Sequence, residues 1–292
     1  MAFTTGFEKI VRANEPLAPH TWLRLGGTAE YFAEPNNVEE LAGIVRRARD
    51  EGLATRLLGG GSNVLVRDQG VSGVVIRLSS PSFNEIQIQK NVVTAGGGAK
   101  LGHVISTSVR EGLAGLETLV GIPGTIGGAL HGNAGSRGGD IGQWTTQATL
   151  MTNTGEICQR TRDELVFAYR ESSLDELVIL GAQFELDQEN PDELTKRMQK
   201  QWIVKKAAQP LDHQSAGCIF KNPRGMSAGM LIDQVGLKGT RVGGAEVSDR
   251  HANFIVAHEG ATSEDVLKLI EQVRERVLDK LGIELELEIQ VW

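Results

Sequence analysis

The feature that most constrains this chain is a glycine-rich stretch at residues 115–135, GLETLVGIPGTIGGALHGNAG. It holds seven glycines in twenty-one residues, with one proline and little charge. Glycine loses the most backbone entropy on folding, so such a stretch is a poor core former. Without Cβ atoms, however, its N–H groups can surround a large anion such as a pyrophosphate. The alternative interpretation is a buried glycine-rich turn in a tightly packed domain.

A second glycine run, GGGSN at residues 59–63, favours the ligand over the plain turn. Together the two runs predict a dinucleotide-sized ligand held mainly by backbone amides. A third run, residues 96–98, looks like the entrance to a dinucleotide-binding βαβ unit, but Leu101 replaces the last glycine of GxGxxG. A partial fingerprint of this kind is weak. A GxxxxGK[ST] motif does not occur, which disfavours a P-loop NTPase.

The bulk properties exclude several classes of protein. A formal net charge of −7 argues against nucleic acid as the main partner, because that function needs a basic face. Cys158 and Cys218 lie far apart and fit no metal-binding spacing, so we expect no metal site and a reducing compartment. No run of 18 apolar residues occurs, and we expect a soluble cytoplasmic protein without a membrane or an obligatory protein partner.

The order of apolar and polar residues predicts an α+β chain in two parts. Helical spacing predicts helices at 191–208, after an Asn190 cap and Pro191, and at about 263–281. Strict alternation predicts a strand at 283–291. We expect an N-terminal lead at 1–20, a first domain at 21–187 and a C-terminal domain at 188–292.

Three places away from the glycines could carry chemistry. Arg170 offers a fork of donors suited to a carboxylate or phosphate, although an exposed ion pair is an equal alternative. Cys218 stands beside Lys221 and Asn222 in a turn-prone segment, where a buried small apolar role is the commoner one. Glu288 lies on the polar face of the last predicted strand, and nothing in the local spacing selects it over Glu286.

Several segments together resemble one family, the UDP-N-acetylenolpyruvoylglucosamine reductases of bacterial cell-wall synthesis, in its shorter subtype. The segments keep the order of that family over nearly the whole chain. They are TWLRLGG (21–27), GGGSNVLV (59–66), GLETLVGIPGTIGGA (115–129), NAG (133–135), YRES (169–172), GCIFKNP (217–223), GLKGTRVGGAEVSDRHANFIV (236–256) and ELELEI (284–289).

The resemblance implies an FAD-binding domain of the vanillyl-alcohol-oxidase (PCMH) type, followed by a smaller α+β substrate-binding domain. It implies an NADPH-dependent enzyme with non-covalent FAD. In this family the enolpyruvyl ether of a UDP-sugar receives hydride at C3 and a proton at C2, and UDP-N-acetylmuramate is formed. Such an enzyme acts in the peptidoglycan pathway and thus in cell-wall biogenesis, cell shape and cell division.

The resemblance also implies roles for individual residues. Arg170, Cys218 and Glu288 match catalytic positions, and the two glycine runs match the FAD-binding loops. The implied FAD-binding residues are Gly59, Gly60, Gly61, Ser62, Asn63, Gly121, Ile122, Pro123, Gly124, Thr125, Gly127, Gly128 and Ala129. The implied substrate-binding residues are Tyr169, Lys221, Asn222 and Arg241.

The chain departs from the family at a few positions. Cys218 stands where the family's proton donor is usually serine; a thiol, with an ordinary pKa of about 8.5, is mostly protonated at neutral pH and could serve as the acid. Ser136-Arg137 replaces a common Ala-Tyr pair, and Ala257 replaces a common asparagine. Two alternatives remain: another FAD-dependent oxidoreductase of the same fold, and a catalytically inactive nucleotide-binding relative.

Overall fold

The computed structural model describes residues 3–136 and 138–292, which form two compact units. The first unit contains the residues up to Glu15, then Glu30–Gly60 and Ser72–Val204. The second contains Pro16–Ala29, Gly61–Val71 and Lys205–Trp292. The second unit is therefore assembled from three separate stretches of chain.

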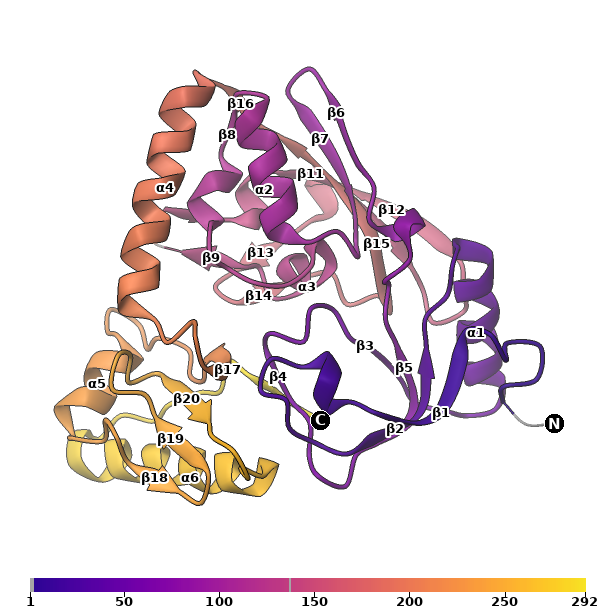
Figure 1. The fold of residues 1–292 in the computed structure, drawn as a ribbon. Coiled ribbons are helices and arrows are strands. Elements are labelled where there is room, and N and C mark those ends of the chain that lie inside the picture. The colour runs from indigo at the N-terminus through magenta and orange to yellow at the C-terminus, as the bar shows by residue number, and fades with distance from the viewer. Residues whose placement is uncertain (1–2, 137) are drawn as a thin grey trace. The chain divides into compact units, whose positions relative to one another are not determined.

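An antiparallel sheet with two short helices against it forms the centre of the first unit (Figure 1). Its strands follow the order β12-β11-β15-β7-β6. They are β12 (Ile157–Thr161), β11 (Thr145–Met151), β15 (Val178–Glu185), β7 (Val92–Gly96) and β6 (Ile86–Gln89). The helices are α2 (Leu101–Arg110) and α3 (Ile126–His131), and apolar side chains such as Val104, Ile126 and Phe184 fill one core between helices and sheet.

A second sheet in the N-terminal region has the order β1-β2-β5-β3. Its strands are β1 (Val11–Pro16), β2 (Thr28–Ala33), β5 (Val71–Ile76) and β3 (Thr55–Leu57). The helix α1 (Val38–Asp50) begins where the Asn37 side chain accepts a hydrogen bond from the Glu40 N–H, and its apolar face packs on this sheet.

Short elements connect these layers. The paired strands are β8 (Leu113–Ala114) with β16 (Asp187–Gln188), β9 (Gly135–Ser136) with β10 (Gly139–Asp140), and β13 (Phe167–Ala168) with β14 (Glu171–Ser172). The 3-10 helices are η1 (Ala18–His20), η2 (Pro81–Phe83), η3 (Leu116–Leu119), η4 (Ile141–Gln143) and η5 (Arg162–Glu164).

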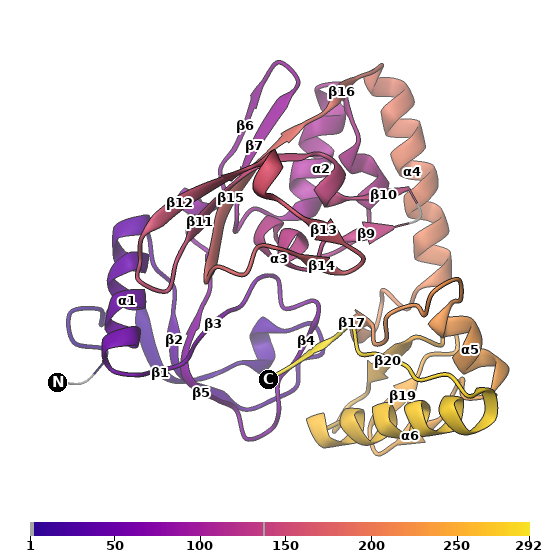
Figure 2. The same cartoon turned by 180° about the vertical axis from the view of Figure 1, so that it is seen from behind.

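The second unit is built on an antiparallel sheet of order β17-β20-β19-β18, of which Figure 1 labels all four strands and Figure 2 labels β17, β20 and β19 from behind. Its strands are β17 (Gln214–Cys218), β20 (Phe254–Ala257), β19 (Ala245–Val247) and β18 (Arg241–Val242). The helices α5 (Ala228–Gln234) and α6 (Ser263–Leu281) share a core with this sheet, and β4 (Val64–Leu65) pairs in parallel with β21 (Gln290–Val291). The helix α6 has a capping box between Thr262 and Asp265 and ends at Gly282, whose φ is 68°.

The predicted long helices are confirmed, whereas the predicted final strand is wrong as a continuous element. Helix α4 is Pro191–Ala208, and α6 has the predicted bounds. Residues 283–291 keep alternating burial, with Leu285 and Ile289 buried, but only one bridge at Leu287 and the short β21 form ladders. The reason is a change of partner, because Leu287 bridges to Phe220 and Gln290 pairs with β4.

Candidate functional site

The two predicted glycine loops meet in the first unit. A Cβ atom built on Gly60 would lie 2.7 Å from the Gly124 Cα, and one on Gly59 would lie 2.9 Å from the Thr125 Oγ1. Any side chain at these positions would therefore push the loops apart. Residues 121–125 are half-buried and Gly128 is exposed. These loops therefore form a partly exposed, glycine-lined surface, called the glycine cradle below, rather than a fully buried turn.

The third glycine run belongs to the same assembly, which its partial fingerprint did not indicate. The Gly127 N–H donates to the Gly97 carbonyl at 2.8 Å, and the Leu101 N–H donates to the Gly124 carbonyl at 3.0 Å. Thr125 caps α3, and its hydroxyl accepts from the Gly128 N–H at 3.3 Å. The run at 96–98 thus supports the loop at 121–128 from behind through backbone hydrogen bonds.

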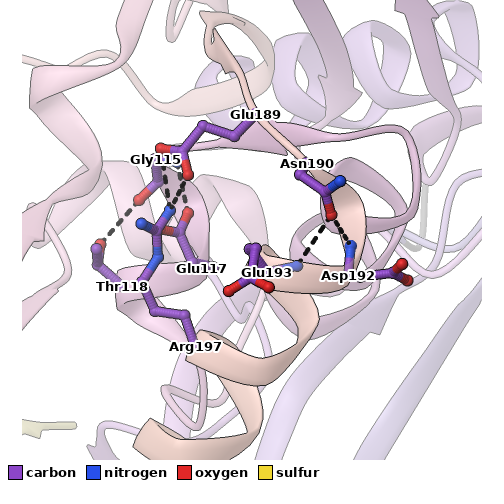
Figure 3. Close-up of polar contacts among 8 residues, drawn as sticks. All are labelled: Gly115, Glu117, Thr118, Glu189, Asn190, Asp192, Glu193 and Arg197. Atoms are coloured by element: carbon purple, nitrogen blue, oxygen red, sulfur yellow. Dashed lines mark hydrogen bonds and ion pairs between the residues drawn. The ribbon is translucent and has the colours of Figure 1, made fainter.

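An ion pair between a buried carboxylate and a partly exposed arginine secures the beginning of the same stretch (Figure 3). Glu117 in η3 is 3% exposed, and its Oε1 lies 2.8 Å from the Arg197 Nη2 on α4. Its other oxygen accepts from the Gly115 N–H at 2.5 Å. The Arg197 pKa is raised, mainly by its hydrogen bond to Glu189 and despite some desolvation, with Glu117 adding to the rise. No sequence pattern indicated Glu117 or Arg197, since the two residues lie far apart in the chain.

The predicted arginine lies in the turn of the β13–β14 hairpin. Arg170 has a φ of 62°, in the left-handed region, and its Nη1 donates to the Gly135 carbonyl at 3.2 Å. Its guanidinium carbon is 5.2 Å from the centre of the neighbouring Tyr169 ring, and Tyr169 is exposed. Ser136 donates to the Thr118 carbonyl, while Arg137 lies outside the described residues.

The second unit brings the GCIFKNP segment beside the C-terminal strip. The Lys221 N–H donates to the Glu286 carbonyl, and the Glu288 N–H donates to the Ile219 carbonyl, each at 2.8 Å. Cys218, Lys221 and Glu288, predicted from distant parts of the sequence, therefore lie on adjacent extended segments. Glu288 is half-buried, whereas Glu286 is exposed and its carboxylate contacts the Lys221 Nζ at 2.6 Å. The structure thus shows that Glu286 and Glu288 differ in exposure, a difference that the alternating pattern did not predict.

Other predicted residues complete this part of the second unit. Asn63, from the GGGSN loop, donates from its side chain to the Glu288 carbonyl at 3.0 Å. Asn222 accepts from the Ala228 N–H at 2.9 Å. Gly61 and Ser62 also belong to this unit, so the predicted loop is divided between the two units after Gly60.

Sequence reasoning missed one residue that fixes this segment. Asn253 is 2% exposed; its side chain accepts from the Phe220 N–H at 2.9 Å and donates to the Phe220 carbonyl at 2.8 Å. It thereby pairs with the backbone midway between Cys218 and Asn222. The available signal was an asparagine inside the apolar run HANFIV, because a buried amide needs hydrogen-bond partners.

Arg241, predicted to bind substrate, forms part of a charged cluster on β18 and β19. Its Nη2 lies 2.5 Å from the Glu246 Oε2, which also contacts the His258 Nε2 at 2.6 Å. Burial raises the pKa of Glu246, but the hydrogen bonds from His258 and Arg241 outweigh that effect and leave the pKa below its ordinary value. This carboxylate can therefore hold the Arg241 guanidinium in one orientation.

Comparison with known proteins first defines the class. Residues 29–160 match a family model described as FAD binding domain. A variant of Phl p 4, a glucose dehydrogenase, superposes with a TM-score of 0.51 over 97% of this chain and 64% of that chain; at 14% identity this likeness concerns the fold alone. The fold is that of an FAD-binding flavoprotein of the predicted α+β, vanillyl-alcohol-oxidase type.

The remaining comparisons define the family. Residues 209–292 match the model UDP-N-acetylenolpyruvoylglucosamine reductase, C-terminal domain. The reductase of that name from Rhodopirellula baltica is 42% identical over 97% of this chain and 93% of its own length. The crystal structure of the Thermus caldophilus reductase superposes with a TM-score of 0.84 at 38% identity, covering 97% of this chain and 99% of that chain. The chain belongs to the UDP-N-acetylenolpyruvoylglucosamine reductase family, as predicted.

Proposed function

We propose that this chain reduces the enolpyruvyl ether of UDP-N-acetylglucosamine enolpyruvate to UDP-N-acetylmuramate at the expense of NADPH. The single observation that carries the proposal is the family relationship over 97% of the chain, with the glycine cradle intact within it. Neither alternative, another oxidoreductase of this fold or an inactive relative, is favoured by these relatives.

The glycine loops are the proposed FAD site. Gly59 and Gly60 lie against Gly124 and Thr125, so backbone groups can approach the pyrophosphate closely. FAD held by these loops would supply the two-electron redox chemistry that links NADPH to the enolpyruvyl double bond. Asn63 follows GGGS where some relatives of this fold carry a histidine that tethers FAD, and we propose that the cofactor here is non-covalent.

Arg170 is proposed to bind the enolpyruvyl carboxylate and stabilise negative charge that develops next to it. A guanidinium provides a fixed fork of donors for a carboxylate, and such donors act most strongly when they are already oriented. The hydrogen bond to the Gly135 carbonyl supports this, because it restricts where the Arg170 side chain can point. Tyr169, beside it in the turn, is proposed to contact the substrate.

Cys218 is proposed to donate the proton to C2. The pairing of the segments at 218–221 and 286–288 supports this proposal, because these segments carry a thiol, an ammonium and carboxylates within the second unit. In this arrangement Glu288 would polarise the substrate, and Lys221, Asn222 and Arg241 would bind it. A thiol can act as a general acid because most of it is protonated at neutral pH.

The proposed setting of the enzyme is the cytoplasm, with small-molecule partners only. UDP-sugar precursors and NADPH are cytoplasmic metabolites, which supports this location. None of the helices in the described part of the chain combines the length and the apolarity of a membrane span.

The test is a spectrophotometric assay of the purified yellow protein and of the Arg170→Met variant. We expect NADPH consumption to depend on added UDP-N-acetylglucosamine enolpyruvate. The variant should bleach with NADPH at the wild-type rate but regain its flavin colour at least about 100-fold more slowly with substrate, as expected for loss of oriented charge stabilisation. Colourless protein, or NADPH consumption that is indifferent to the substrate, would refute the proposed function. Equal losses in both half-reactions would refute the role of Arg170.

A further inference from the structure

The backbone around Arg170 is held in an unfavourable conformation. Its φ of 62° is rare for a residue with a long side chain, and such conformations persist only where the surroundings impose them. The hairpin that carries it is short, because β13 and β14 contribute two residues each. Contacts from outside the hairpin must therefore fix the turn.

Asn133 supplies the most enclosed of these contacts. It is 2% exposed, and its Nδ2 donates to the Ala168 carbonyl at 2.7 Å. Its Oδ1 accepts from the N–H of buried Gly142 at 3.1 Å. The amide thereby joins the last residue of β13, two positions before Arg170, to the middle residue of η4. Asn133 itself has a φ of 40°, which asparagine tolerates better than most residues do.

The same segment reaches the hairpin at two further points and continues back to the glycine cradle. Ser172 donates to the His131 carbonyl at 3.0 Å, and Arg170 donates to the Gly135 carbonyl at 3.2 Å. His131 ends α3, which begins directly after Thr125 of the cradle. Residues 125–135 thus connect the proposed FAD site with the hairpin inside one compact unit.

We propose that Asn133 is a positioning residue that sets the place of Arg170 relative to the glycine cradle. The hydrogen bond from the Gly142 N–H holds the Asn133 amide, and the amide in turn fixes the carbonyl of Ala168 and, through it, the left-handed turn at Arg170. The inference rests on the proposed roles of Arg170 and of the cradle. Losing the amide frees the turn without removing any group that contacts substrate or FAD.

Two variants and a matched control test this proposal. Asn133→Gly removes the amide and tolerates the positive φ. Asn133→Asp keeps the acceptor for Gly142 but presents no donor to the Ala168 carbonyl at neutral pH. Asn14→Gly is the control, because exposed Asn14 in β1 also has a positive φ, 53°, and the same change in chain entropy applies.

Hydrogen exchange of the FAD-free protein gives a readout independent of catalysis. We expect the amides of residues 165–174 to exchange at least about tenfold faster in both Asn133 variants and at the wild-type rate in Asn14→Gly. A cooperative thermal transition in each of the three variants shows that it is folded. Unchanged exchange in this hairpin would overturn the proposal.

The two half-reactions of the loaded enzyme give the second readout. Bleaching by NADPH should keep the wild-type rate, while reoxidation by substrate should slow about 10- to 100-fold in both Asn133 variants, because a misplaced binding group costs rate. Wild-type reoxidation in the variants, or equal slowing of both steps, would overturn the inference. A wild type that substrate fails to reoxidise would instead refute the proposed function, and the exchange data would still decide whether Asn133 fixes the hairpin.

Discussion

Cys218 stands at the position where the family resemblance implies a serine as proton donor. It lies at the end of β17, and the carbonyl of the next residue, Ile219, accepts a hydrogen bond from the Glu288 N–H. Both cysteines lie in the described part of the chain, and no disulfide joins Cys218 to Cys158. A thiol is more acidic than a serine hydroxyl but is a weaker hydrogen-bond donor. Its proposed role as an acid therefore depends on positioning by neighbours such as Asn253.

Substitution at Cys218 tests its role as proton donor. We expect Cys218→Ser to keep turnover, because the hydroxyl can still supply a proton and binds more strongly as a donor. Cys218→Ala should be bleached normally by NADPH but be reoxidised by substrate about 100-fold or more slowly, the usual contribution of a general acid. Stopped-flow absorbance of the flavin measures both steps. Rapid reoxidation of the alanine variant would eliminate Cys218 as the donor.

At the residue scale, sequence patterns identified the glycines but assigned no role to Asn133 or Asn253. Glycine runs are visible because close backbone approach requires that residue type, and the loops at 59–60 and 124–125 do meet. Asn133 and Asn253 act through backbone groups 33 or more positions away, at Ala168 and Phe220. Nothing in a local pattern indicates which distant carbonyl an amide will reach. The catalytic roles assigned to Arg170, Cys218 and Glu288 stay predictions.

Among the elements, α4 has the clearest structural task. Its first half carries Arg197 to the buried carboxylate of Glu117, which in turn accepts from the Gly115 N–H (Figure 3). The element was predictable, since Asn190 caps it and Pro191 occupies its first turn. Its contact was not predictable, because an exposed, charged helix face does not reveal a buried partner. The prediction of one continuous strand at 283–291 was wrong for a related reason, because a strand forms only where a neighbouring segment pairs with it.

Removing the arginine should weaken both stability and the proposed FAD site. In Arg197→Met the Glu117 carboxylate stays buried without its cation, so we expect a loss of about 1–3 kcal/mol in the free energy of unfolding. FAD should also bind more weakly, because the stretch that begins at Gly115 loses its anchor. Urea denaturation of the FAD-free protein and fluorescence titration with FAD measure the two effects.

Two further variants make this test specific. Lys196→Met changes the neighbouring helix residue, whose ion pair with Glu193 is exposed, and should leave stability and FAD affinity nearly unchanged. Arg197→Met combined with Glu117→Gln should be more stable than Arg197→Met alone, because the buried group is then neutral. Wild-type stability and FAD affinity in Arg197→Met would contradict the anchoring role.

For the molecule as a whole, neither compact unit is a single continuous stretch of the chain. The chain passes from one unit to the other after Glu15, Ala29, Gly60, Val71 and Val204. A sequence read from end to end suggests contiguous domains at 21–187 and 188–292, and these functional boundaries stay a prediction. In the structure, residues 16–29 and 61–71 instead belong to the same compact unit as the C-terminal part. Patterns of composition cannot show this, since the pairing of β4 with β21 joins residues more than 200 positions apart.

The C-terminal stretch is therefore expected not to fold alone. Leu23 and Leu65, both fully buried, belong to the same core as the apolar residues of α6. Asp68 and Ser263 exchange hydrogen bonds at the start of α6, from the Asp68 N–H to the Ser263 Oγ at 2.9 Å and from the Ser263 N–H to the Asp68 Oδ1 at 3.2 Å. The Trp292 N–H also donates to the Leu65 carbonyl. A fragment without residues 16–29 and 61–71 loses all of these contacts.

We predict that a fragment of residues 205–292 shows poorly dispersed amide NMR signals and no cooperative unfolding in urea, while the full chain unfolds cooperatively under the same conditions. The physical reason is the small core, because a chain of this size is marginally stable even when its core is complete. In the full chain, Leu65→Ala should lower the unfolding free energy by about 2–5 kcal/mol, the usual cost of truncating a buried leucine. A fragment with dispersed signals and a sigmoidal transition would show that residues 16–29 and 61–71 are dispensable for this fold, and a Leu65→Ala variant as stable as the wild type would agree with that result.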